Sequence, residues 1–307
     1  MHYINKEGKK TMAQKKTNTK KPLIILCAVV VVAVLAFLIY DEVKSNGYMT
    51  QLNEAIANTA AIQSGSATGT SYVYNEGSER DSGSSETRHA LYVRSDSGIT
   101  FQESAGSEDG SEVISNFFIR PGEYFYLDTA NNQWIRTDLQ EGLDVRPYSI
   151  SAATNQISSS QIRRIHKTTV DGKDAFEVIF NRQWLMSSYQ AQGSSGEPLT
   201  GSLIYILNTD GDTTYVEQTQ QILKVRVSDS EGKDVTQITE DINTLINGAT
   251  EEGGDVQQAL DNYFAENIEG NYVESTDLEQ EQSSTEQTGE EATIGSSGEE
   301  TTVGTSD

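Results

Sequence analysis

The chain has 307 residues, enough for one or two domains, and a formal net charge of -24. Residues 1–21 carry seven Lys and one Glu, a net charge of +6, so the remainder of the chain carries -30. A surface this acidic repels nucleic acid and other polyanions, which argues against nucleic-acid binding. The single cysteine, Cys27, cannot form a disulfide within the chain.

An unbroken run of 18 uncharged, mostly apolar residues, Leu23–Tyr40, follows the lysines. As a helix it would span about 27 Å, close to the hydrocarbon thickness of a bilayer. Lysine-rich flanks stay in the cytoplasm, so we expect residues 1–21 to be a cytoplasmic tail and the chain after Tyr40 to lie outside. A cleaved signal peptide is the alternative, but the run is long and has no A-x-A-like site. We therefore predict a transmembrane signal anchor over residues 22–40, with Cys27 as an apolar filler because no lipobox precedes it.

Residues 44–247 are predicted to form one extracytoplasmic, β-rich domain. It begins with an amphipathic helix within residues 41–64, which Ser64-Gly65-Ser66 ends. The apolar stripe of this helix consists of Tyr48, Leu52, Ala55, Ile56, Thr59 and Ile62. The polar face consists of Gln51, Asn53, Asn58 and Gln63.

From residue 69, short runs of β-branched and aromatic residues alternate with turn signals, which predicts antiparallel strands. At Asp171-Gly172 the sequence suits a type I′ turn, in which both central residues have positive φ. Residues 139–160 are predicted to be a connection with a short helix, and residues 182–200 to contain another. The strands are expected at residues 71–74, 89–93, 99–101, 113–119, 123–128, 133–137, 161–170, 173–181, 202–207, 213–228 and 235–242.

After Gly248 the composition changes. Asp255 is a good helix N-cap, and an apolar stripe follows it, so we predict an additional amphipathic helix over residues 255–269. Residues 273–307 consist largely of Glu, Ser, Thr, Gln and Gly. They cannot bury enough apolar surface to fold, and we predict a disordered acidic tail.

The order of these elements resembles the LolA/LppX/LprG-like superfamily of bacterial envelope lipoproteins and lipoprotein carriers. The resemblance is carried by an amphipathic helix that runs directly into the first strand, Met49–Tyr74. It is also carried by a Tyr strand followed by a Trp strand, Tyr124–Asp128 and Gln133–Ile135, and by the strand start Val170–Phe176. It covers roughly residues 48–246.

The resemblance implies an α+β fold, with a curved antiparallel half-barrel sheet and helices on its concave side. It also implies an apolar cavity between sheet and helices that holds acyl chains or another lipophilic ligand. The chain departs from the family in its signal anchor, which replaces a lipidated Cys, in the helix after Asp255 and in the acidic tail. Because a carrier must shuttle, a permanent anchor favours a resident binding role.

No catalytic, metal or cofactor site is predicted, and we expect no enzymatic activity. His2, His89 and His166 lack metal-ligand spacing, and no Gly-x-Ser-x-Gly motif occurs. The candidates for lining a lipophilic cavity are Tyr92, Phe101, Phe118, Tyr124, Tyr126, Trp134, Phe176, Phe180, Trp184 and Tyr205. The same alternation suits a filled core, so both interpretations stay open. Strand Tyr124–Leu127 is apolar on both faces, which requires cover on both sides or a ligand.

We therefore expect a membrane-anchored, extracytoplasmic, non-enzymatic domain that binds a lipophilic or lipid-linked ligand in the cell envelope. The alternative is a structural or interaction module of an envelope complex with a filled core and no ligand. The expected partners are the membrane, a lipid or lipoprotein ligand, and an envelope protein. The localisation expected is the cell membrane of a Gram-positive-type bacterium, with a single span and the bulk of the chain outside.

Overall fold

The computed structural model describes residues 44–107, 112–139, 146–191, 196–229 and 231–275. The chain divides into two units, Met1–Gly47 and Tyr48–Asp307, and the fold below is that of the second. The predicted anchor and cytoplasmic tail lie outside the described residues. Within the described residues, no helix has the length and apolar character needed to cross a membrane.

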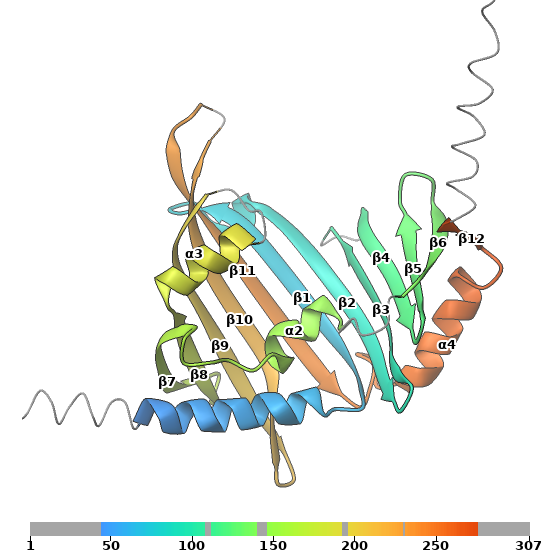
Figure 1. Ribbon diagram of the computed structural model, residues 1–307, viewed down its shortest axis with the longest axis horizontal. Helices are drawn as coiled ribbons and strands as arrows, with labels where there is room; N and C mark the ends of the chain where they lie inside the picture. The colour runs from blue at the N-terminus through green and yellow to red at the C-terminus, as the bar shows by residue number, and fades with distance from the viewer. Residues whose placement is uncertain (1–43, 108–111, 140–145, 192–195, 230, 276–307) are drawn as a thin grey trace, which may run out of the picture. The chain divides into compact units, whose positions relative to one another are not determined.

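A curved sheet of 12 strands dominates the described part of the second unit (Figure 1). Its order is β12-β6-β5-β4-β3-β2-β1-β11-β10-β9-β8-β7. The strands are β1 (Ser64–Asn75), β2 (Ser84–Ser95), β3 (Gly98–Gly106), β4 (Val113–Arg120), β5 (Glu123–Asp128), β6 (Gln133–Asp138), β7 (Ile162–Val170), β8 (Lys173–Phe180), β9 (Glu197–Asp210), β10 (Thr213–Ser228), β11 (Asp234–Asn247) and β12 (Tyr272–Glu274). The helices are one over residues 44–60, η1 (Arg80–Ser82), α2 (Tyr148–Thr154), α3 (Arg182–Ala191) and α4 (Val256–Asn267).

The α+β class and the curved, mainly antiparallel sheet predicted from the sequence are confirmed. Asp171 and Gly172 have φ values of 49° and 80°, as the predicted turn requires. Several strands extend further than predicted; for example, β1 begins at Ser64 and β11 ends at Asn247. The expected helix stop at Ser64-Gly65-Ser66 is therefore the start of a strand.

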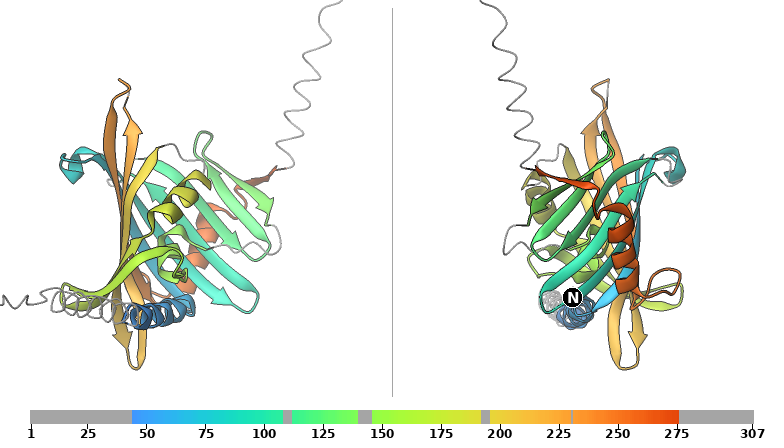
Figure 2. Two further views of the ribbon diagram at one scale, coloured as in Figure 1. Left: turned by 60° about the vertical axis from the view of Figure 1, so that its left-hand side comes forward. Right: turned by 90° about the vertical axis from the view of Figure 1, so that its right-hand side faces the viewer.

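One face of the sheet, here called the inner face, carries residues 48–60 of the first helix together with α2 and α3 (Figure 2). Four residues of the predicted apolar stripe, Leu52, Ala55, Ile56 and Thr59, are buried, and the other two, Tyr48 and Ile62, are half-buried. The sheet curves around α2 and α3, as the resemblance implies. The inner-face core contains Leu52, Ala55, Ile56, Ala153, Ile165, Phe176, Val178, Leu203, Tyr205 and Val216, and beside them Ala67, Ala90, Tyr92, Phe101, Ile119, Ile150 and Leu245.

Helix α4 covers the opposite face, here called the outer face (Figure 2). Asp255 caps this helix, because its side chain accepts a hydrogen bond from the Gln258 amide at 2.8 Å. The outer-face core consists of Phe118, Phe125, Trp134, Val256, Leu260 and Ile268. Phe125 is fully buried under α4, whereas its neighbour Tyr124 packs on the inner face. Strand β5 therefore has cover on both faces, as its composition requires. The resemblance implied helices on the concave side, and α4 departs from that arrangement.

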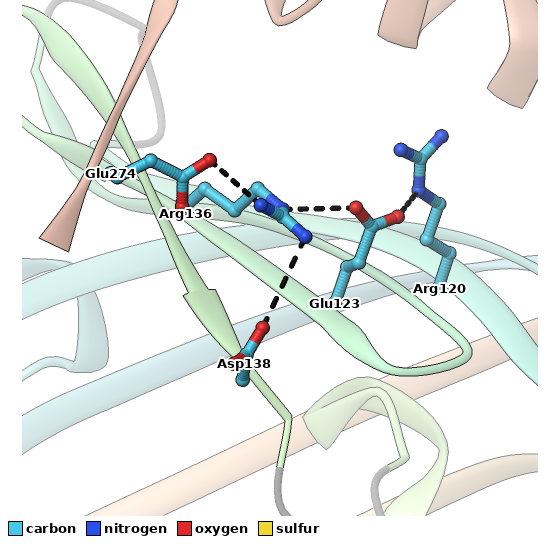
Figure 3. A network of polar contacts seen from close by, with 5 residues as sticks. All are labelled: Arg120, Glu123, Arg136, Asp138 and Glu274. Atoms are coloured by element: carbon cyan, nitrogen blue, oxygen red, sulfur yellow. Dashed lines mark hydrogen bonds and ion pairs between the residues drawn. The ribbon is translucent and has the colours of Figure 1, made fainter. Parts of the chain in front are cut away.

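Strand β12 follows α4 and pairs with β6 in parallel. Val273 and Glu274 therefore belong to the sheet and not to the acidic tail predicted over residues 273–307. An ionic network holds this strand to its neighbours (Figure 3). Arg136 contacts Glu274 at 2.7 Å and Glu123 at 2.9 Å, and Glu123 also pairs with Arg120.

Polar side chains tie the helix over residues 44–60 to the sheet. Strand β10 has a bulge between Val216 and Gln218, which interrupts its pairing with β9. The buried hydroxyl of Thr59 accepts a hydrogen bond from the Val216 amide at 2.8 Å and donates one to the Ala55 carbonyl. Asn58, assigned to the polar face by its spacing, donates to the Thr214 carbonyl. The helix is thus positioned by hydrogen bonds as well as by apolar packing.

Substitution of Thr59 by Val keeps the shape of the side chain but leaves the buried Val216 amide without an acceptor. An unsatisfied buried donor costs about 1–3 kcal/mol, so we expect Thr59→Val to lower the free energy of unfolding by that amount. Urea denaturation followed by circular dichroism measures it. Thr59→Ser keeps the hydroxyl, so its free energy of unfolding should decrease markedly less. An equal decrease in both variants would mean that the hydrogen bond is not the cause.

The network around Glu123 predicts a pH dependence. The hydrogen bond from Arg120, with the charges of Arg120 and Arg136, lowers the pKa of Glu123 from its ordinary value of 4.5. A carboxyl with a lowered pKa stabilises the fold above its ordinary pKa, and this contribution is lost as the pH falls through the folded value. We expect Glu123→Gln to cost about 1 kcal/mol near neutral pH and the difference from wild type to shrink on acidification.

Thermal melts of wild type and Glu123→Gln across an acid series measure this difference. Glu269→Gln is the matched control, because Glu269 is exposed and forms no ion pair within the described residues. A Glu123→Gln effect that stays constant with pH would contradict the assignment.

Candidate functional site

A pocket of about 370 Å³ lies on the inner face, between α3, the segment from α2 to residue 161, and strands β8–β10. Its apolar lining consists of Ala152, Ile157, Phe180, Trp184, Leu185, Gly201, Leu203, Ile222 and Leu223, together with the rings of Tyr189 and Tyr205. Its polar lining consists of Ser151, Asn155, Gln156, Gln161, Ser188 and Gln221. The pocket therefore presents apolar and amide groups to a ligand.

Helix α3 forms one wall and is held close to the sheet. Asn181 accepts a hydrogen bond from the Gln183 amide at 2.8 Å, which starts the helix. A Cβ atom at Gly201 would lie 3.0 Å from a methyl carbon of Leu185, so the glycine allows this close approach. The Trp184 and Phe180 rings lie 5.0 Å apart at 32°. Trp184 is therefore fixed at the pocket wall by contact with the end of β8.

The facing wall is the segment after α2, and Asn53 fixes it. Its side-chain amide donates to the Ile157 carbonyl at 3.0 Å and accepts from the Ile157 amide at 3.1 Å. The Gln161 carbonyl then accepts a hydrogen bond from the Asn181 amide at 2.8 Å, next to the start of α3. This backbone hydrogen bond connects the two walls at one end of the pocket.

The pocket is electrically neutral. None of its 17 described lining residues carries a formal charge at neutral pH. Burial raises the pKa of Tyr205 above its ordinary value, so its hydroxyl stays protonated at neutral pH. At the rim, Arg146 donates to the Asn155 side-chain oxygen at 3.0 Å. A ligand would therefore meet an uncharged interior with a positive group near the edge.

The structure brings three of the ten sequence-predicted candidates into this pocket, namely Phe180, Trp184 and Tyr205. The other inner-face candidates, Tyr92, Phe101, Tyr124 and Phe176, pack within the core. Tyr126 lies beside Tyr124, with ring centroids 5.7 Å apart. Phe118 and Trp134 lie on the outer face, beneath α4.

None of the six polar lining residues was among the sequence-predicted candidates, and several apolar ones were also missed. Leu203 could have been found, because it lies two residues before Tyr205 on β9 and so shares its face. Gln221 likewise lies two residues before Leu223 on β10. The amides of Asn155, Gln156 and Gln161 belong to an irregular segment, for which periodicity gives no signal.

No protein-family model matches this sequence, and no curated protein sequence matches it. Among solved structures, a DUF1329 family protein from Desulfovibrio piger is similar at 8% identity and a TM-score of 0.28, over 66% of this chain and 92% of that chain. A LolA superfamily protein from Nitrosomonas europaea is similar at 9% identity and a TM-score of 0.25, over 64% and 91%. An S-type phycobiliprotein lyase from Guillardia theta is similar at 8% identity and a TM-score of 0.21, over 62% and 90%. Similarities at this level establish no family, and the function is inferred below from the residues of this chain.

Removal of the Asn53 side chain should loosen the wall that contains Ile157. Asn53→Ala deletes both hydrogen bonds to the Ile157 backbone, each worth about 1 kcal/mol. We expect the Ile157 amide to exchange with solvent at least fivefold faster, while amides of the central strands keep their protection. Hydrogen exchange followed by mass spectrometry measures this; Gln51→Ala, an exposed change on the same helix, is the control. Unchanged exchange at Ile157 would show that Asn53 does not hold this wall.

Proposed function

We propose that this chain is a non-enzymatic binding protein that holds the apolar part of a lipophilic or lipid-linked ligand in the inner-face pocket. The observation that carries the proposal is the absence of charge among the described lining residues. Because 22% of the residues of the chain are charged, a random set of 17 would contain three or four charges. An uncharged lining around Trp184 and Phe180 favours an uncharged, apolar group.

The size of the pocket limits the ligand. A volume of about 370 Å³ lies at the lower end of the range of roughly 300–1,000 Å³ found for small-molecule sites. It suits one acyl chain or a group of similar size. The amides of Gln156 and Gln161 and the nearby Arg146 suit a polar head group that remains at the rim.

We further propose that the domain works outside the cell while attached to the membrane. The support comes from the sequence: Leu23–Tyr40 has the length and composition of a transmembrane helix, and seven lysines precede it. The helix of the folded domain begins at residue 44, only a few residues later. Such a domain would stay within reach of lipid in the envelope of a Gram-positive-type bacterium.

The alternative is an interaction module without a ligand. It is favoured by the packing of the inner-face core, in which the side chains of Tyr92, Phe101 and Phe176 are almost fully buried. Much of the space between helices and sheet is therefore filled. The two functions differ in whether an acyl chain enters the pocket beside Trp184.

The two tryptophans of the chain allow a direct test, because Trp184 lines the pocket and Trp134 lies on the other face of the sheet. The full chain is placed in nanodiscs that contain a monoacylglycerol with a brominated acyl chain, which quenches tryptophan on contact. We expect saturable quenching in Trp134→Phe, which retains Trp184, and little in Trp184→Phe, which retains Trp134. Quenching of neither tryptophan, or equal quenching of both, would favour the interaction module.

A pocket-filling variant sharpens this test. Ser188 lines the pocket, whereas its neighbour Ser187 on α3 is exposed and does not. In the Trp134→Phe background, Ser188→Phe should weaken the apparent affinity for the brominated lipid at least tenfold, and Ser187→Phe should leave it unchanged. Equal effects of the two variants would place the lipid elsewhere on the chain.

A further inference from the structure

A second concavity lies on the outer face, where the β5–β6 turn meets the C-terminal end of α4. It has a volume of about 660 Å³. We call it the amide cleft; its lining consists of Asn116, Leu127, Asn131, Asn132, Gln133, Trp134, Tyr263, Glu266, Asn267 and Asn271. Figure 1 shows α4 beside β5 and β6. The inner-face pocket is on the other side of the sheet, so the two sites are separate.

The composition of the amide cleft is unusual for this chain. Five of its ten lining residues are Asn, compared with 17 of 307 in the whole sequence, and Gln133 adds a sixth amide. Each side-chain amide has an NH₂ group that donates two hydrogen bonds and an oxygen that accepts them. Such a group can therefore bind two adjacent hydroxyl groups of a ligand. The cleft is thus lined for a ligand with many hydrogen-bonding groups.

Several of these amides are available to a ligand. Asn116 is already used, since it accepts from Gln102 at 3.0 Å and donates to the Tyr263 hydroxyl at 2.6 Å. By contrast, the side chains of Asn132, Gln133 and Asn271 form no hydrogen bond within the described part of the chain. Asn132 and Asn271 are exposed, one on each side of the cleft.

Aromatic rings form a rigid base for these amides. The Tyr263 ring is parallel to the Phe118 ring, at 1° and 6.3 Å, and perpendicular to that of Trp134, at 87° and 6.4 Å. Its hydroxyl is held by Asn116. An aromatic ring beside amide groups suits a ligand that has apolar C–H faces as well as hydroxyls.

Charge narrows the class of ligand further. Glu266 is the one charged residue among those lining the cleft, and the lining contains no Lys, Arg or His. An anion would find no cationic partner there, and a metal ion would find a single carboxylate. The remaining class is an uncharged polyhydroxylated molecule.

We propose that the amide cleft binds an uncharged saccharide chain. Asn132, Gln133 and Asn271 donate to and accept from its hydroxyl or acetamido groups, and Tyr263 contacts the C–H face of a sugar ring. The site lies on the sheet face opposite the inner-face pocket, so a saccharide bound there would leave that pocket open. This inference does not depend on the proposed function.

The test uses the full chain in a detergent without a sugar head group, titrated by calorimetry with chitotetraose and, separately, with cellotetraose. We expect saturable binding of at least one; a preference for chitotetraose would show that acetamido groups are recognised. Asn132→Gly combined with Asn271→Ala should weaken binding at least tenfold. Glycine is chosen because Asn132 has a φ of 49°, which glycine adopts without strain.

Two controls separate this proposal from folding defects and from the lipophilic pocket. Asn247→Ala removes an exposed amide outside the cleft and should leave saccharide binding unchanged. Ser188→Phe, which fills the inner-face pocket, should also leave it unchanged. The proposal is overturned if neither oligosaccharide binds, or if the Asn132→Gly and Asn271→Ala pair has no effect on an affinity that wild type shows.

Discussion

The pairing of β1 with β11 joins the two halves of the sheet, and the rest of the fold depends on its register. Within each half, β1–β6 and β7–β11, strands that follow one another along the chain are neighbours in the sheet. The two halves are hydrogen-bonded to each other only where β1 pairs with β11, from Gly65 opposite Asn247 to Asn75 opposite Gln237. A Cβ atom at Gly65 would lie 2.5 Å from the Ile246 carbonyl oxygen, so the close approach requires glycine. A slip of one residue would turn every side chain of one half to the other face. The inner and outer cores could not then form together.

The sheet has an apolar core on each face, and each core has its own helical cover. The helix over residues 44–60, α2 and α3 cover the inner face, and α4 covers β2–β6 on the outer face. The two concavities lie where this cover ends: the pocket beside α3 and the amide cleft beside the last turn of α4. Their linings differ because the inner one continues a hydrophobic core, whereas the outer one is built from a turn and a helix end.

Periodicity predicted much of this arrangement, because strand alternation and a helical stripe are local properties of the sequence. Strand Tyr124–Leu127 was expected to be covered on both sides, and α4 covers one side while the inner-face core covers the other. Asn53 and Asn58 were assigned to a polar face, but their partners lie 104 and 156 residues away, which local spacing cannot reveal. β12 was missed because three residues are too few to show alternation. Only Phe180, Trp184 and Tyr205 among the predicted aromatics line the pocket, since alternation assigns a face without showing which part of it a helix fills.

The parallel pairing of β12 with β6 has a consequence for how the sheet meets other molecules. A sheet that ends in a long unpaired strand offers a row of free N–H and C=O groups, on which another chain can add and start aggregation. Here β12 occupies half of the β6 edge, is itself three residues long, and is held by Arg136 and its carboxylate partners. At the other end of the sheet, the β7 edge is interrupted by a bulge at Arg163 and carries the exposed Arg164 beside it. Both ends of the sheet thus carry features that disfavour growth by strand addition.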